Sequence, residues 1–171
     1  GEGTVIVQAS SGLGANTSTT ARGIDLGLNL GDVSMGNNVV LQATNSVVVP
    51  QSIYVAPNTS SATRSISLSG SGAATFNNEI YLDGDLTVSG GTGTVTLSGK
   101  IINNKGLIIS GGTVVLSNNT NTYTGATAIN SGTLNLTGNI ASGSAVSVAS
   151  GATLSGNGTA AGTVAVTGTI S

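Results

Sequence analysis

The residues of this chain that could do chemistry are few, and most of them gather in one short segment. Glu79, Asp83 and Asp85 lie close together in the sequence, interleaved with Tyr81. A pair of carboxylates could serve acid–base hydrolysis of a polysaccharide, and several could ligate Ca²⁺ through oxygen. The order Asp83-Gly84-Asp85 also suits an exposed turn, because Asp and Gly favour turn conformations. The segment predicts a turn, with a calcium site and a catalytic pair as alternatives.

The composition excludes many other kinds of site. The chain has no His and no Cys, which excludes a Ser–His–Asp triad, thiol catalysis and most zinc sites. Its net charge of −2 and the lack of a basic patch argue against nucleic-acid binding. We therefore expect neither an enzyme nor a bound cofactor, and no metal beyond the calcium alternative.

The elements that hold these residues are predicted by the same composition. Only 6% of the 171 residues are charged and 2% are aromatic, whereas a globular domain carries about 25% charged residues. A disordered chain of this polarity would carry more charge or proline. A β-solenoid needs neither, because its core is a narrow stack of aliphatic side chains and its surface can be Ser, Thr and Asn. No apolar run approaches the length of about 20 residues that spans a membrane.

Short runs of alternating apolar residues recur along the chain, which places one face of each run in a core. One series recurs at steps of 19, 20 and 18 residues: Leu97, Leu116, Leu136 and Leu154. A step of about 20 residues marks one coil of a solenoid, so the chain predicts an all-β parallel β-helix of about eight coils. The expected core residues are Val95, Leu97, Val114, Leu116, Ile129, Leu134, Leu136, Val148, Leu154 and Val166.

We expect a single domain over residues 1–171, with irregular coils in 1–83 and regular coils in 84–171. A long loop is predicted at Gln8–Ala21, because this segment is rich in Ser, Thr and Gly. Early strands are predicted at Gly3–Val7, Ile24–Leu30, Val39–Ala43, Val47–Val49, Ile53–Val55, Ser65–Leu68, Ala74–Phe76 and Ile80–Leu82. No helix is expected, since apolar residues nowhere recur at helical spacing.

Several polar and aromatic residues also recur at turns. Four Asn pairs stand at Asn37-Asn38, Asn77-Asn78, Asn103-Asn104 and Asn118-Asn119. In coils about 4.8 Å apart their side-chain amides could form ladders, and sugar binding is the alternative. Three tyrosines could form a platform for sugar, although one of them could instead cover a core edge: Tyr54, Tyr81 and Tyr123. An outward threonine ladder is predicted at Thr94, Thr113, Thr133, Thr153 and Thr163.

The segment Gly112–Leu136 resembles the autotransporter-associated β-strand repeat, also called the passenger-associated transport repeat, of Gram-negative autotransporters. The matching residues are Gly112-Thr113-Val114, Leu116, Asn121-Thr122-Tyr123-Thr124-Gly125, Thr127, Ile129 and Gly132-Thr133-Leu134. The family usually has one residue fewer before the Asn-Thr-Tyr-Thr-Gly turn and often has Gly in place of Ala126. The resemblance implies a right-handed parallel β-helix exported to the cell surface, and it implies no particular activity.

We therefore expect a structural extracellular role at the surface of a Gram-negative bacterium, as a stalk, a fibre segment or an adhesin scaffold. A carbohydrate-active or glycan-binding β-helix is the alternative. The chain has no initiator Met and no signal-peptide pattern at Gly1, so we expect a piece of a longer exported protein. The expected partner is a second copy stacked end to end or further coils of that parent, with a host or surface glycan as another candidate.

Overall fold

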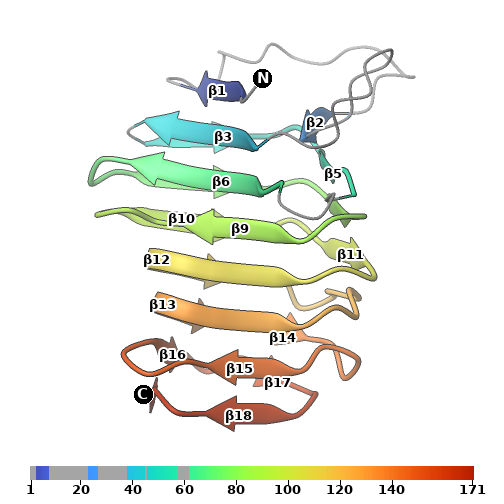
Figure 1. Ribbon diagram of the computed structural model, residues 1–171, viewed down its shortest axis with the longest axis vertical. Helices are drawn as coiled ribbons and strands as arrows, with labels where there is room; N and C mark the ends of the chain where they lie inside the picture. The colour runs from blue at the N-terminus through green and yellow to red at the C-terminus, as the bar shows by residue number, and fades with distance from the viewer. Residues whose placement is uncertain (1–2, 8–22, 27–37, 45, 58–61) are drawn as a thin grey trace.

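The computed structural model describes residues 3–7, 23–26, 38–44, 46–57 and 62–171. In these ranges all regular elements are β-strands, and every strand pair is parallel (Figure 1). The strands stack in coils of about 21 residues and make about six turns of a β-solenoid, which confirms the predicted fold class. The estimate of about eight coils was too high, because the early coils are longer than 20 residues. No helix in the described ranges is long and apolar enough to cross a membrane.

Each coil contributes strands to three faces of the stack. The first face holds β1 (Gly3–Val7), β3 (Val39–Thr44), β6 (Arg64–Ser69), β9 (Leu86–Ser89), the first parts of β12 (Leu107–Leu116) and β13 (Thr127–Leu136), β15 (Val146–Val148) and β18 (Val164–Val166). The second face holds β4 (Val47–Val49), β7 (Ala73–Phe76), β10 (Thr94–Leu97), the second parts of β12 and β13, β16 (Thr153–Ser155) and β19 (Thr169–Ile170). The third face holds β2 (Ile24–Leu26), β5 (Ile53–Val55), β8 (Ile80–Leu82) and β11 (Ile101–Asn103), and lower in the stack the two-stranded sheet of β14 (Asn139–Ile140) and β17 (Thr159–Ala160).

The predicted early strands all have counterparts in the structure. The strand predicted at Ile24–Leu30 is described only as far as Leu26, and its remainder lies outside the described residues, as does the loop predicted at Gln8–Ala21. In the threonine ladder, Thr153 is followed in register by Thr169. The expectation for Thr163 was therefore wrong, because this residue precedes β18 on the first face instead.

Successive coils shorten towards the C-terminus while their core columns stay in register. On the first face the register leads at steps of 22, 21, 20, 19 and 18 residues through Ile66, Val88, Ile109, Ile129, Val148 and Val166. Because each step places an inward residue over an inward residue, the loss of one residue per coil falls in the turns. The regular step that the sequence showed is therefore compatible with a stack that narrows.

Nine of the ten residues expected in the core are buried: Val95, Leu97, Val114, Leu116, Ile129, Leu134, Leu136, Val148 and Leu154. Val166 is 40% exposed, so the expectation for this residue was wrong. It continues the column of Ile129 and Val148. The reason for its exposure is that no described coil lies below β18.

Glycines form the corner between the first and second faces. Gly112 and Gly132 have φ angles of 62° and 76°, in the left-handed region that favours glycine. A Cβ on Gly132 would lie 2.4 Å from the carbonyl oxygen of Gly112, and a Cβ on Gly112 would lie equally close to that of Gly91. The corner therefore requires glycine both for its backbone conformation and for the close approach of neighbouring coils.

Candidate functional site

Tyr54 and Tyr81 lie one above the other on the outer side of the third face. They are the central residues of β5 and β8, and their neighbours Ile53 and Val55 point inward, so strand alternation turns both tyrosines outward. Their ring centroids are 6.2 Å apart with 34° between the planes, and both side chains are half-buried. In the same outward column Asp25 precedes them. The coils therefore bring together two of the three tyrosines noted in the sequence.

Carboxylates accept the hydroxyl protons of both tyrosines. Tyr54 donates to Oδ2 of Asp83, whose Oδ1 accepts a hydrogen bond of 2.8 Å from Nδ2 of Asn103. Tyr81 donates to Oε2 of Glu79. This hydrogen bond, followed by burial and by the negative charge of Glu79, raises the pKa of Tyr81 above its ordinary value. The hydroxyl of Tyr81 consequently stays protonated at neutral pH and keeps its hydrogen on the carboxylate.

The three carboxylates considered for calcium make separate hydrogen bonds. Asp85 stands apart from the tyrosine contacts, and its Oδ1 accepts a hydrogen bond of 2.7 Å from the backbone N–H of Gly106 in the next coil. The described residues include no group of three or more Asp, Glu, His or Cys side chains that could hold a metal ion. Glu79 and Asp83 therefore serve the tyrosine pair, and the calcium alternative finds no geometry to support it.

The described charges concentrate around this same sheet. Six of the seven charged residues in the described ranges lie in or next to β2, β5, β8 and β11: Asp25, Glu79, Asp83, Asp85, Lys100 and Lys105. Four negative and two positive charges leave a local sum of −2. No charged residue follows Lys105 in the sequence. We call the outer side of these four strands, with their flanking residues, the tyrosine face.

The seventh charged residue, Arg64, is buried in the core side of β6. It stands in register with Val39 above and Leu86 below. Its guanidinium donates to the carbonyl oxygens of Thr63 at 3.4 Å and Pro57 at 3.5 Å, and burial lowers its pKa. Sequence reasoning missed this position, although the two-residue step that leads on to Ile66 already places Arg64 on the inward side.

Asn121 joins the upper and lower parts of the third face. In the coils above, the first N–H of a third-face strand donates to a backbone carbonyl of the coil below. At Ile101 the acceptor is instead the side-chain Oδ1 of Asn121, at 2.8 Å. The Nδ2 of Asn121 donates to the carbonyl oxygens of Asn118 at 2.9 Å and of Asn139, one coil below, at 2.8 Å. The buried amide therefore does the work of a peptide group where the coil has no strand.

Tyr123 is fully buried, unlike the other two tyrosines. Its hydroxyl lies 2.7 Å from Oγ1 of Thr127, which lies 3.0 Å from Oγ of Ser144, and all three side chains are buried. Burial raises the pKa of Tyr123, and the hydrogen bonds of the two hydroxyls oppose part of that rise. The Asn-Thr-Tyr-Thr-Gly segment thus places two of its side chains inside the fold, so Tyr123 is no part of a surface platform.

The other asparagines also bond to neighbouring coils, but through the backbone. Nδ2 of Asn78 donates to the carbonyl oxygen of Pro50, and Nδ2 of Asn118 donates to that of Ser98, both at 3.0 Å. Among the described residues these amides do not pair with one another as a ladder would require. The expected link between coils is present, while its geometry differs, since a turn amide reaches the carbonyl of the coil above more directly than another amide.

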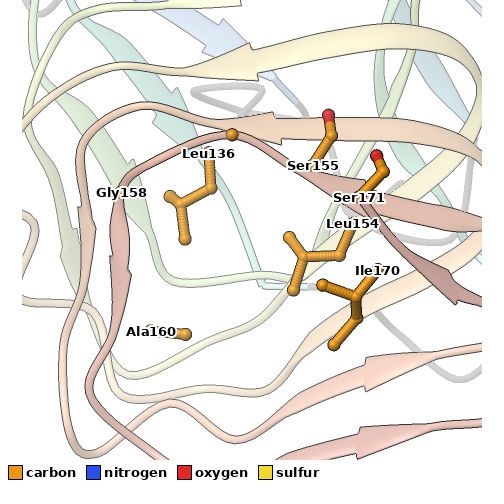
Figure 2. A pocket seen from close by; sticks show the side chains of 8 residues that line it. Leu136, Leu154, Ser155, Gly158, Ala160, Ile170 and Ser171 are labelled. Atoms are coloured by element: carbon orange, nitrogen blue, oxygen red, sulfur yellow. The ribbon is translucent and has the colours of Figure 1, made fainter.

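The lower end of the stack contains an open hollow with about 150 Å³ of space. Figure 2 shows Leu136 and Ala160 on one side of it and Leu154 and Ile170 on the other. Ala160 pairs in register with Ile140 of the coil above, so a methyl group stands where that coil has a much larger side chain. The hollow therefore lies where the core column of the third face runs out of bulk.

Comparisons with known proteins add no relative. No family model matches the chain. Among curated proteins there is no match, and among solved structures there is none either. The residues of the tyrosine face, the Asn121 link and the open end are consequently the features on which a function can be argued.

Proposed function

We propose that this chain is a structural β-solenoid that works outside the cell, as a segment of a stalk or fibre or as the scaffold of an adhesin on a bacterial surface. The observation that carries the proposal is the unbroken set of core columns, which continue in register from coil to coil down to β18. Such a stack is a rigid spacer whose length is set by the number of coils.

The chemistry of the chain supports this placement. A chain without Cys has no thiol that an oxidising space would damage. The repeat-like segment Gly112–Leu136 resembles a repeat of exported autotransporters, and its residues Asn121 and Tyr123 have structural work inside the coil. These residues keep coils together, which suits a scaffold better than a binding site.

The lower end of the stack supports a role in assembly. Val164, Val166 and Ile170 continue three apolar columns and are 41%, 40% and 62% exposed. Open strand edges with exposed apolar residues invite a further strand, and charged residues normally guard against this. Since no charge follows Lys105, a further parallel coil pairs with β18 and β19. It comes either from a longer parent chain or from a second copy stacked head to tail.

Sedimentation and electron microscopy of the purified chain test the assembly. We expect end-to-end oligomers or fibres that Val166→Lys weakens, because it places a charge at the open end. Ser147→Lys is the matched control, since it adds the same charge to an exposed position of β15 away from that end. A monomer at all concentrations would contradict stacking of copies.

The extracellular part of the proposal has its own test. Antibody against the chain should label intact cells of its source as strongly as permeabilised cells. Label that appears only after permeabilisation would contradict an extracellular role, and it would leave the assembly test unaffected.

The carbohydrate-active alternative has no comparable support in the described residues. Glu79 and Asp83 accept hydrogen bonds from tyrosines, and Asp85 accepts one from the backbone. Glycan binding without hydrolysis would use the pair Tyr54 and Tyr81, and it is tested below against a partner of different chemistry.

A further inference from the structure

We propose that the tyrosine face binds a cationic segment of a partner protein, with an arginine or lysine side chain laid over Tyr54 and Tyr81. This interaction is separate from the assembly proposed for the open end. It uses a different face of the stack and residues of different chemistry.

The two rings supply the aromatic surface for a cation. Their centroids are 6.2 Å apart and the rings are only half-buried, so part of each remains accessible. A cation within about 6 Å of a ring centroid is attracted by the negative face of the ring. A guanidinium also stacks on aromatic rings through its flat shape, so it suits two neighbouring rings better than an ammonium.

The atoms around the rings accept hydrogen bonds and have few hydrogens left to donate. Each tyrosine has given its only hydroxyl proton to a carboxylate, Tyr54 to Asp83 and Tyr81 to Glu79. Phenolic and carboxylate oxygens then offer lone pairs outward. A guanidinium or an ammonium donates hydrogen bonds and accepts none, which makes it the complementary group.

The charges favour the same partner. The described charges in or next to β2, β5 and β8 are all negative, namely Asp25, Glu79, Asp83 and Asp85, and both lysines of the tyrosine face flank β11. A neutral sugar could stack on the rings but would gain nothing from these charges. A basic segment gains from them at every step of its approach, and its binding weakens as salt screens the charges.

Fluorescence anisotropy with a labelled peptide of alternating Arg and Gly tests the proposal, with a neutral N-acetylglucosamine hexasaccharide as the competing probe. We expect the peptide to bind, to bind more weakly as salt rises, and to lose about tenfold in affinity in the double variant Tyr54→Ala/Tyr81→Ala. The double variant Tyr54→Phe/Tyr81→Phe keeps both rings, and we expect it to bind within about threefold of the parent.

Two single variants separate a local effect from a general loss of charge. Asp83→Asn and Asp85→Asn each remove one negative charge, but only Asp83 contacts a tyrosine. We expect Asp83→Asn to weaken peptide binding more than Asp85→Asn does. The proposal is overturned if the peptide fails to bind, if the alanine variant binds it as the parent does while keeping the parent's melting temperature, or if the hexasaccharide binds through the tyrosines in its place.

Discussion

The central coils and the last coil are built on the same residue pattern and differ in how much of it is buried. Leu134, Leu154 and Ile170 occupy one core column in successive coils. Their exposed fractions are 0%, 8% and 62%. The column that ends at Val166 becomes exposed in the same direction. Because the side chains are similar, the difference comes from the coil below each residue and not from the residue itself.

This difference shows where the stability of the stack lies. In a solenoid each coil gains most of its stability from the interfaces with its two neighbours. A central coil buries its apolar side chains on both sides, at roughly 25 cal/mol per Å² of area removed from water. The last coil has only one described interface. A change at equivalent positions should therefore cost much in the centre and little at the end.

The largest contrast is expected for a charge placed in this one column. Leu134→Asp buries a carboxylate without a partner and should lower the free energy of unfolding by about 4 kcal/mol or more. Ile170→Asp is the matched control, because its carboxylate can reach water, and it should cost less than about 1 kcal/mol. Urea unfolding followed by circular dichroism measures both. Equal losses would mean that the two coils are covered alike.

A smaller loss is expected when the link between the two parts of the third face is cut. Asn121→Ala leaves the N–H of Ile101 and the carbonyl of Asn139 without their partner. Buried groups left in this way should cost about 3 kcal/mol together. Asn119→Ala is the control in the same turn, because Asn119 is exposed, and it should change stability by less than about 0.5 kcal/mol. A loss at Asn121 no greater than at Asn119 would show that the link is dispensable.

Two glycines of the same corner compare a covered coil with one that is open. Gly132 and Gly151 have φ angles of 76° and 80°. An alanine at either site pays for the left-handed conformation, about 1 kcal/mol. At Gly132 the added Cβ would also lie 2.4 Å from the carbonyl oxygen of Gly112, whereas at Gly151 no atom lies within 4 Å. Gly132→Ala should therefore lower the melting temperature clearly more than Gly151→Ala, and the reverse order would contradict the corner packing.

The buried tyrosine of the central repeat should make stability depend on alkaline pH. The pKa of Tyr123 in the folded chain is raised by burial above its value in the unfolded chain, which is about 10. Its contribution is then fully present below pH 10 and is lost above it, by up to about 1.4 kcal/mol per pH unit. In Tyr54→Phe/Tyr81→Phe, where Tyr123 is the remaining tyrosine, its absorbance should titrate only as the chain unfolds. Titration near pH 10 with the fold intact would show that it is accessible.

Much of the fold could be predicted because alternation and a constant step both encode which residues face inward. Leu116 and Leu136 could be assigned to one column from spacing alone, since a slip of one residue would turn them outward. Val166 could not be assigned correctly, because its exposure depends on what covers β18 and not on the pattern around it. Arg64 followed the pattern but was overlooked, since a charged residue is seldom placed in a core.

The candidate site was harder to predict. Tyr54 and Tyr81 are separated by 27 residues in the sequence and still stand in register. A coil of that length departs from the step of about 20 that reveals the later coils. Asn121 looked like any asparagine in a turn, because the sequence does not show that the strand expected at this place is missing. Both failures arise where the coils are irregular, and the local chemistry of turns gives no register.

The smallest expected effect is a gain, and it concerns the hollow at the open end. Ala160→Ile adds the bulk that Ile140 supplies one coil above, next to Leu136 and Ile170. Because the hollow is open to solvent, the gain in unfolding free energy should be about 1 kcal/mol, below the 2–5 kcal/mol that Ile140→Ala should cost in the covered coil. If a further coil inserts a side chain into this hollow, Ala160→Ile should also weaken end-to-end association while it stabilises the monomer. Thermal unfolding and sedimentation of the same sample measure the two effects. A variant that gains no stability would show that the hollow is not the end of the core column.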